Sequence, residues 1–273
     1  MPSYDRELSL ARQAARLAGD YIRREYESFE PIPDAPVSIS THVDRTSQDL
    51  ILDFLRQHVP DDAFRAEEDT PAYRQCRKAG SRVWVIDPID GTRGFARKNG
   101  QFSIMIGLTV DEQPLVGVVY EPIADVMTFA SRGQGCFVAR QDAEPMRCQV
   151  SGRMTLDGCT VVKSHTKPGA SAPEVAALAP ANMIVTYSAG IKLAVVARGE
   201  ADVYPNDYSR FSDWDICAGH ILVTEAGGIV TQLRGEPVSY GGPEYRQTGG
   251  LLATNGHLHA EAVLRMRQME SGS

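Results

Sequence analysis

The stretch that decides the fold reads Trp84-Val85-Ile86-Asp87-Pro88-Ile89-Asp90-Gly91-Thr92-Arg93-Gly94-Phe95. Residues 83–86 form a short apolar run of the kind found in buried strands. Because Pro88 has no N–H to donate to a sheet, we expect the strand to end there. Gly91 permits a sharp turn, and a helix is expected to begin just after it. Asp87 and Asp90 are then held at a strand end, beside backbone N–H groups that can face an anion.

Two interpretations of these acids stay open at this level. The generic pattern Asp-x-x-Asp-Gly fits a plain polar turn after a strand as well as it fits a binding site. An EF-hand is excluded, because its loop needs acids at alternate positions before the glycine. A P-loop is not indicated either, since the chain has no G-x-x-x-x-G-K-[ST].

The segments on either side of this stretch predict helices packed on an antiparallel sheet. Apolar residues recur at helical spacing over residues 5–29, and a second helix is expected after Asp44, ending near Pro60. Four strands are then predicted, at residues 102–110, 115–120, 126–130 and 136–139. We expect these strands to form a meander against the two N-terminal helices.

The second half of the chain alternates between predicted strands and helices, which is typical of an α/β arrangement. The polar segment 141–158 separates the two halves. We therefore predict an N-terminal α+β domain, residues 1–145, with most of the acidic ligands, and a C-terminal α/β domain, residues 146–273, that completes the substrate pocket. The predicted elements of the second half are strands at 160–163, 183–187, 202–204, 229–232 and 251–254, and helices at 191–197, at 214–226 and from 257.

Composition narrows the class of protein. The chain has 273 residues and a net charge of −7, with no long basic block. This argues against non-specific binding to nucleic acid polymers or anionic membranes, but not against an anionic ligand held by metal ions. Five scattered cysteines without a C-x-x-C favour reduced thiols in a cytoplasmic protein. We expect no signal peptide, and the sequence predicts no membrane-spanning helix, because no apolar run is long enough.

Four acids have the chemistry of a metal site if the fold brings them together: Glu67, Asp87, Asp90 and Asp215. Taken singly, Glu67 fits a solvated loop and Asp215 fits a helix-capping acid. Together, four like charges are unfavourable without cations, and oxygen ligands select a hard ion such as Mg²⁺. Two such ions can activate water and hold a phosphoryl group. Hydrogen bonding is the expected role of His165 and His220.

Three motifs in order resemble those of the inositol monophosphatase superfamily of Mg-dependent, lithium-sensitive phosphatases. They are Glu67-Glu68, the segment 87–92, and Trp214-Asp215 running to Glu225-Ala226-Gly227-Gly228. The resemblance implies the layered α-β-α-β-α sandwich of the inositol monophosphatase and fructose-1,6-bisphosphatase type. The segments 92–102, 162–165 and 192–204 look like those of the 3′(2′),5′-bisphosphate nucleotidases, which convert 3′-phosphoadenosine 5′-phosphate to AMP and phosphate.

Carried over residue by residue, the resemblance implies these roles. Glu67, Asp87 and the Ile89 carbonyl resemble the ligands of one Mg²⁺, and Asp87, Asp90 and Asp215 those of a second; a third, weaker ion is expected near Glu67. Asp44 and Thr92 match the pair that activates water, so the catalytic set is Asp44, Glu67 and Thr92. The substrate-binding set is Asp90, Gly91, Thr92, Ser164, His165, Lys192 and Asp215.

The chain departs from the family pattern at several positions. Ala189 stands where a serine is usual, with Ser188 one place away. Asn206 stands where an arginine for the second phosphate is common. Lys192 is the partner expected for that phosphate, with Arg210 as a helper that could replace the arginine. Residues 31–36 also lack the usual lysine upstream of Asp44.

The leading interpretation is a Mg-dependent bisphosphate nucleotidase that acts on a small phosphorylated metabolite, as a monomer or a homodimer. The alternative is an inositol monophosphatase or another sugar or polyol phosphatase. The remote alternative is a non-catalytic relative that only binds the ligand.

Overall fold

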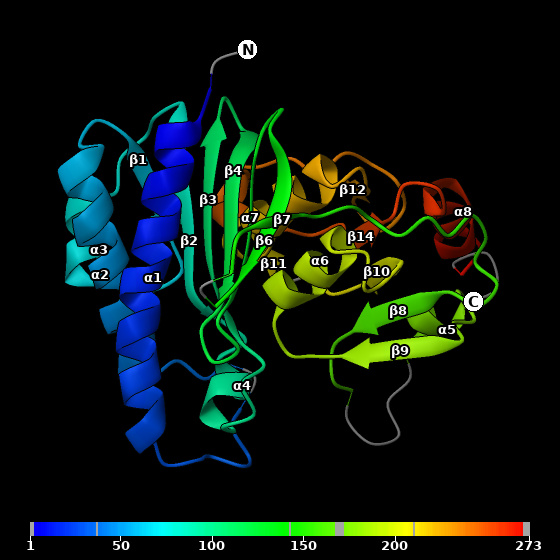
Figure 1. Ribbon diagram of the computed structural model, residues 1–273, viewed down its shortest axis with the longest axis horizontal. Coiled ribbons are helices and arrows are strands. Elements are labelled where there is room, and N and C mark those ends of the chain that lie inside the picture. Colours follow the sequence, from blue (N-terminus) through cyan, green and yellow to red (C-terminus); the bar gives the residue numbers. More distant parts are fainter. Residues whose placement is uncertain (1–2, 37, 142, 167–171, 210, 270–273) are drawn as a thin grey trace.

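The structure is a computed structural model that describes residues 3–36, 38–141, 143–166, 172–209 and 211–269. Its helices and sheets stack in layers in the order helix, sheet, helix, sheet, helix, as Figure 1 shows. This is the predicted α-β-α-β-α sandwich. The layers matter for function because the clustered acids come from more than one of them.

The first helical layer covers one face of the larger sheet. It consists of α1 (Asp5–Ser28) and α2 (His42–His58), with the short α3 (Pro71–Cys76) beside α2. The buried residues of α1 include Leu10, Ala14, Ala18 and Ile22, which recur at helical spacing and pack in one apolar cluster with the sheet. The predicted packing on the meander is confirmed for α1, whereas α2 packs on the preceding strand, Arg82–Asp90.

The larger sheet has seven strands that neighbour one another in sequence order. β1 and β2 are parallel, and the other neighbouring pairs are antiparallel. The strands are β1 (Ala63–Ala66), β2 (Arg82–Asp90), β3 (Ser103–Val110), β4 (Gln113–Glu121), β5 (Val126–Ser131), β6 (Gly135–Arg140) and β7 (Met146–Arg147). The short helix α4 (Thr92–Ala96) follows β2 directly.

The central layer consists of α6 (Ala189–Ala197) and α7 (Asp213–Glu225), which lie between the two sheets (Figure 1). α7 approaches β4 closely at Gly117, where an added Cβ would lie 2.3 Å from the Ala218 carbonyl oxygen. α6 approaches α7 closely at Gly219, where a Cβ would lie 2.3 Å from the Leu193 side chain. Larger residues at either glycine would push the central layer apart.

The smaller sheet has five strands in the order β12-β14-β10-β8-β9 and is covered by the outer helices. Its strands are β8 (Thr160–Lys163), β9 (Asn182–Val185), β10 (Val203–Asn206), β12 (Ile229–Thr231) and β14 (Leu251–Thr254); the outer helices are α5 (Pro173–Ala176) and α8 (His259–Gln268). A separate two-stranded ribbon pairs β11 (Phe211–Ser212) with β13 (Arg246–Gln247), which follows the single turn η1 (Pro243–Tyr245).

The structure corrects some local predictions. β2 does not end at Pro88 but runs to Asp90, because its pairing with β3 is interrupted between Asp87 and Asp90 and needs no N–H from the proline. Asp44 does not precede the second helix but lies in its first turn. The segment before Glu67 is a strand, β1, which was not predicted. The division into domains at residue 145 stays a prediction.

The cysteines and the apolarity of the helices can be compared with the predictions from composition. All five cysteines are free thiols. Among the helices that the structure describes, none has the length and apolarity needed to cross a membrane.

Candidate active site

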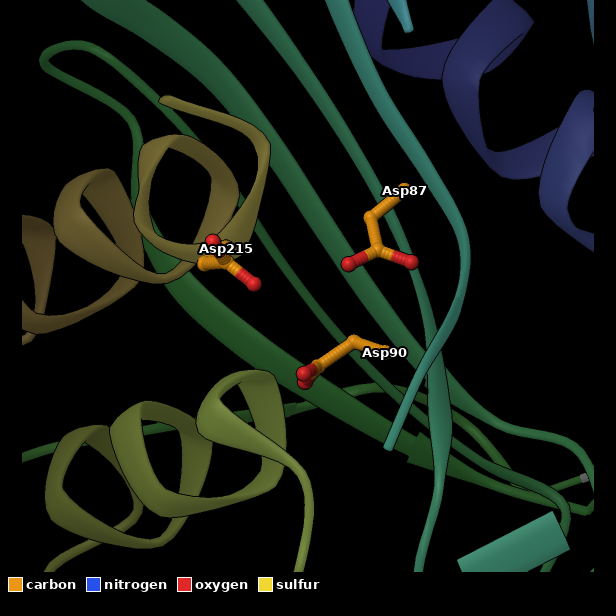
Figure 2. Close-up of side chains that lie close together, drawn as sticks. All are labelled: Asp87, Asp90 and Asp215. Atoms are coloured by element: carbon orange, nitrogen blue, oxygen red, sulfur yellow. The ribbon is translucent and has the colours of Figure 1, made fainter. Parts of the chain in front are cut away.

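Three carboxylates meet between the larger sheet and the central helical layer. Asp87 and Asp90 come from the end of β2, and Asp215 comes from the first turn of α7. One oxygen of each lies within 4.8 Å of the others, and Figure 2 shows the three side chains pointing into the same space. This acidic centre unites residues more than 120 positions apart in the sequence.

Glu67 joins the acidic centre because β1 runs parallel to β2. The Glu67 N–H donates to the Ile86 carbonyl at 3.2 Å, which places Glu67 next to Asp87. The two carboxyl groups are close enough for each to affect the pKa of the other. Protein surrounds Glu67, yet its side chain stays open to water in the cleft. All four predicted acids therefore lie together.

The pKa values of the clustered carboxyl groups are raised, because the groups are buried and because negative charges packed together without a cation repel one another. Burial, with the charge of Asp90, raises the pKa of Asp215 to about 7. Burial and neighbouring carboxylates raise the pKa of Glu67 and of Asp87 well above their ordinary values. A divalent cation removes this repulsion, and an all-oxygen donor set suits Mg²⁺. The residues present therefore fit the predicted metal.

Asp90 has a set of partners that the sequence did not reveal. Its Oδ2 accepts hydrogen bonds from the Ser188 hydroxyl and, at 2.6 Å, from the Gly190 N–H. Burial raises the pKa of Asp90, while the Lys192 charge and these hydrogen bonds oppose the rise. Ser188 also begins α6, where its oxygen accepts from the Ile191 N–H at 2.9 Å. Ser188, one position before Ala189, therefore supplies a hydroxyl to the acidic centre.

Lys192 is buried behind the acidic centre. Its amine donates to the Tyr187 carbonyl at 2.9 Å and lies 5.4 Å from the centre of the Tyr204 ring. Burial lowers the pKa of Lys192 to about 8, while Asp90 and Asp215 oppose that shift. Lys192 is therefore positioned to balance the charge of the carboxylates.

Thr92 and Asp44 form a hydrogen-bonded pair beside the acidic centre. The Thr92 Oγ1 lies 2.9 Å from Asp44 Oδ1 and 3.1 Å from the Ile89 carbonyl oxygen. The other Asp44 oxygen accepts from the Thr41 N–H at 2.9 Å, a capping box that begins α2. Burial raises the pKa of Asp44 to about 6. The predicted pair is thus brought together at the start of two helices.

The acidic centre opens into a cleft of about 800 Å³. Gly91, Ser164 and His165 line it as predicted. His165 Nε2 lies 2.7 Å from Gln101 Oε1, and the His165 ring stacks on Tyr187 at 4.1 Å between ring centres. His220 does not line this cleft, and its Nδ1 lies 2.9 Å from the Tyr240 hydroxyl, a hydrogen bond of the kind predicted for it.

Asn206, which stands where the arginine is usual, is occupied by contacts within the protein. The Asn206 side chain donates to the Tyr204 hydroxyl at 2.9 Å and accepts from the Tyr208 N–H at 2.7 Å, so both ends of its amide are used. Arg210 lies outside the described residues. Arg246, which was not predicted, lines the cleft. Its place depends on the pairing of β11 with β13, for which the sequence carries no local signal.

The raised pKa of Asp215 predicts how Mg²⁺ affects thermal stability. An acid with a folded pKa near 7 and an unfolded pKa near 3.8 binds more protons in the folded state, so metal-free stability falls as pH rises between these values. Mg²⁺ competes with those protons and should restore the loss. We expect the difference in Tm between samples with MgCl₂ and with EDTA to grow from pH 5 to pH 8. A constant difference across that range would contradict an ion bound by these carboxylates.

Comparisons with known proteins agree with this geometry. The model of the inositol monophosphatase family matches residues 4–270. The 3′(2′),5′-bisphosphate nucleotidase CysQ of Salmonella typhimurium is 32% identical over 242 residues, covering 84% of this chain and 91% of that protein. The inositol monophosphatase of Mesembryanthemum crystallinum is 31% identical over 236 residues, covering 82% and 84%.

A solved structure extends the similarity to three dimensions. The Thermotoga maritima IMPase superposes with a TM-score of 0.80 at 26% identity, covering 99% of each chain. The family match and these relatives identify the protein as a phosphatase. Metal binding is typical of this family. The chain belongs to the inositol monophosphatase family.

Proposed function

We propose that the protein is a Mg²⁺-dependent 3′(2′),5′-bisphosphate nucleotidase that converts 3′-phosphoadenosine 5′-phosphate to AMP and phosphate. The observation that carries the proposal is the acidic centre beside a Thr–Asp pair, at the base of a cleft large enough for a nucleotide. The identity to the CysQ nucleotidase supports this choice of substrate within the family.

The four acids are assigned to the metal ions. Glu67, Asp87 and the Ile89 carbonyl would hold one Mg²⁺, and Asp87, Asp90 and Asp215 a second. A third ion near Glu67 is part of the same proposal. Bound Mg²⁺ supplies positive charge to the phosphoryl oxygens and lowers the pKa of water.

Thr92 and Asp44 are assigned to the attacking water. Asp44 is ionised at neutral pH, because its pKa is about 6, and it can accept the Thr92 hydroxyl proton. Thr92 Oγ1 can then accept a hydrogen bond from water and orient it toward phosphorus. General-base catalysis is most efficient when the pKa of the base lies near the pH at which the enzyme works.

Gly91 and Thr92 are assigned to the phosphate. Gly91 has a φ of 90°, and a Cβ there would lie 2.9 Å from the Gln101 carbonyl oxygen, so a side chain is excluded where the cleft wall turns. The turn at Gly91 leads into the start of α4, and Gly91 and Thr92 both line the cleft in which the phosphate would bind. The nucleoside would extend along the cleft toward Ser164 and His165, where the ring stacked on Tyr187 offers an aromatic surface for a base.

The test is phosphate release by purified protein with MgCl₂. We expect a higher kcat/KM for 3′-phosphoadenosine 5′-phosphate than for inositol 1-phosphate. Inositol 1-phosphate is the comparison substrate because one relative of similar identity is the inositol monophosphatase of M. crystallinum. A preference for inositol 1-phosphate would replace the proposal by that function, and release of phosphate from neither would favour a ligand-binding relative.

A further inference from the structure

Arg246 is a cation that has no assigned role in metal binding at the acidic centre or in water activation by the Thr92–Asp44 pair. Its side chain is 51% exposed, and within the described residues its one ion-pair partner is Glu244, at 4.0 Å. It lines the same cleft as the four acids and is close enough to Asp215 to act on it electrostatically. An exposed guanidinium beside an acidic centre is free to bind an anionic group of the substrate.

The backbone that carries Arg246 is held in an uncommon conformation. Glu244 and Tyr245 are consecutive non-glycine residues in the left-handed region, with φ of 52° and 58°. Such conformations persist only where surrounding contacts enforce them, and they concentrate at functional sites. Here the Tyr245 ring is held under the Arg65 guanidinium, 4.8 Å from the ring centre, and contacts Trp214 edge to face.

Asp213 fixes both ends of the same segment. Its carboxylate is fully buried and accepts from the Gly241 N–H at 2.9 Å and from the Gln247 side chain at 2.8 Å. It also accepts from Arg65 at 3.1 Å. Asp213 is the first residue of α7, the helix that presents Asp215. The first turn of α7 therefore holds both Asp215, in the acidic centre, and Asp213, which fixes the segment that carries Arg246.

The other cations of the cleft are less suited to an outer anion. Lys192 is 1% exposed and bonded to a carbonyl behind the acidic centre. Arg93 donates to the Ala35 carbonyl at 3.2 Å and lies over the Tyr187 ring. Lys163 offers a single ammonium on a flexible stem, whereas a guanidinium can grip a phosphate with two parallel hydrogen bonds.

A bisphosphate needs such a cation. One phosphate lies at the acidic centre in the proposed reaction, and the other lies beyond it in a cleft that also contains Glu174, Asp207 and Glu244. Without a nearby positive group, this second phosphate would meet mainly like charge.

We propose that Arg246 binds the second, non-reacting phosphate and thereby determines the preference for a bisphosphate; this inference rests on the proposed nucleotidase function. Arg246 is a specificity-determining residue, and Asp213 is its positioning residue.

The test compares two substrates that differ only in the second phosphate, 3′-phosphoadenosine 5′-phosphate and adenosine 3′-monophosphate. We expect Arg246→Gln to lower kcat/KM for the bisphosphate about 10- to 150-fold, the range for a hydrogen bond to a charged group, and to spare the monophosphate. Arg246→Lys should recover part of the loss. The product AMP, which keeps the 5′-phosphate, should inhibit Arg246→Gln more weakly, while inhibition by inorganic phosphate stays unchanged.

Two controls make the result specific. Arg265→Gln changes the net charge equally on the distant helix α8 and should leave both substrates unaffected. Lys163→Gln tests the competing cation, and a loss confined to that variant would overturn the assignment. Equal losses on both substrates in Arg246→Gln would also overturn it, because Arg246 would then serve the reacting phosphate or the fold.

The wild-type protein separates the two proposals. If it prefers the bisphosphate to the monophosphate and Arg246→Gln keeps that preference, the inference about Arg246 is wrong and the nucleotidase function stands. If the wild type has no such preference, the nucleotidase function fails and the inference fails with it.

Discussion

Replacement of Asp90 by Asn is expected to lower kcat/KM at least about 10³-fold while the protein stays folded. The substitution removes one negative ligand from the acidic centre and keeps the side-chain shape. The charge stabilisation that a metal site supplies is several kcal/mol, and each 1.36 kcal/mol is a tenfold change in rate. Phosphate release with saturating MgCl₂ measures the loss.

The fold of Asp90→Asn should be intact for a local reason. The amide oxygen of Asn can still accept from the Gly190 N–H, and the repulsion that raises the pKa of Asp90 and its neighbours falls. We therefore expect the Tm in EDTA to be equal to or above that of the wild type. Asp53→Asn, the same change on the exposed surface of α2, should leave activity unchanged. A folded Asp90→Asn variant with near-native turnover would falsify the metal assignment.

Replacement of Thr92 by Ala is expected to lower kcat about 10²- to 10⁴-fold, the usual contribution of a positioned base, with little change in KM. The hydroxyl links the attacking water to Asp44 through the 2.9 Å contact, and that link matters mainly in the transition state. Steady-state kinetics on 3′-phosphoadenosine 5′-phosphate would separate the two constants.

Thr92→Ser is the matched control, because it keeps the hydroxyl and removes only a methyl group; its kcat should fall less than about tenfold. The pH profile gives a second readout. Asp44 accepts a proton only when ionised, and its pKa is about 6, so activity should decline as pH falls through that value. If Thr92→Ala kept its wild-type kcat, the residue would serve only to begin α4.

Much of the architecture could be predicted because its signals are local. The apolar period of α1 and the short apolar runs that form the strands of the meander need only neighbouring residues to be recognised. The four acids could be named from their motifs, and the structure brings them together as expected. Their roles as ligands, and those of Asp44 and Thr92 in catalysis, remain predictions.

The features that escaped prediction depend on contacts between distant segments. β1 has only four residues, one of them Arg65, and its identity as a strand comes from parallel pairing with β2. Ser188 becomes a partner of Asp90 only when α6 is placed against the end of β2. Arg246 reaches the cleft through its pairing with Ser212, 34 positions away. Composition and spacing carry no trace of such pairings.

The close seating of α7 on β4 at Gly117 has a consequence for heat inactivation. At Gly117 the Ala218 carbonyl and the Ile221 side chain of the helix lie directly against the strand backbone. Asp215 therefore cannot move away from Asp87 and Asp90 by local melting of a loop; the middle of the molecule must open first. Such a core opens only in the cooperative transition of the whole fold. Catalysis should accordingly persist on warming until the protein unfolds as a unit, with no lower temperature at which a folded but inactive form accumulates.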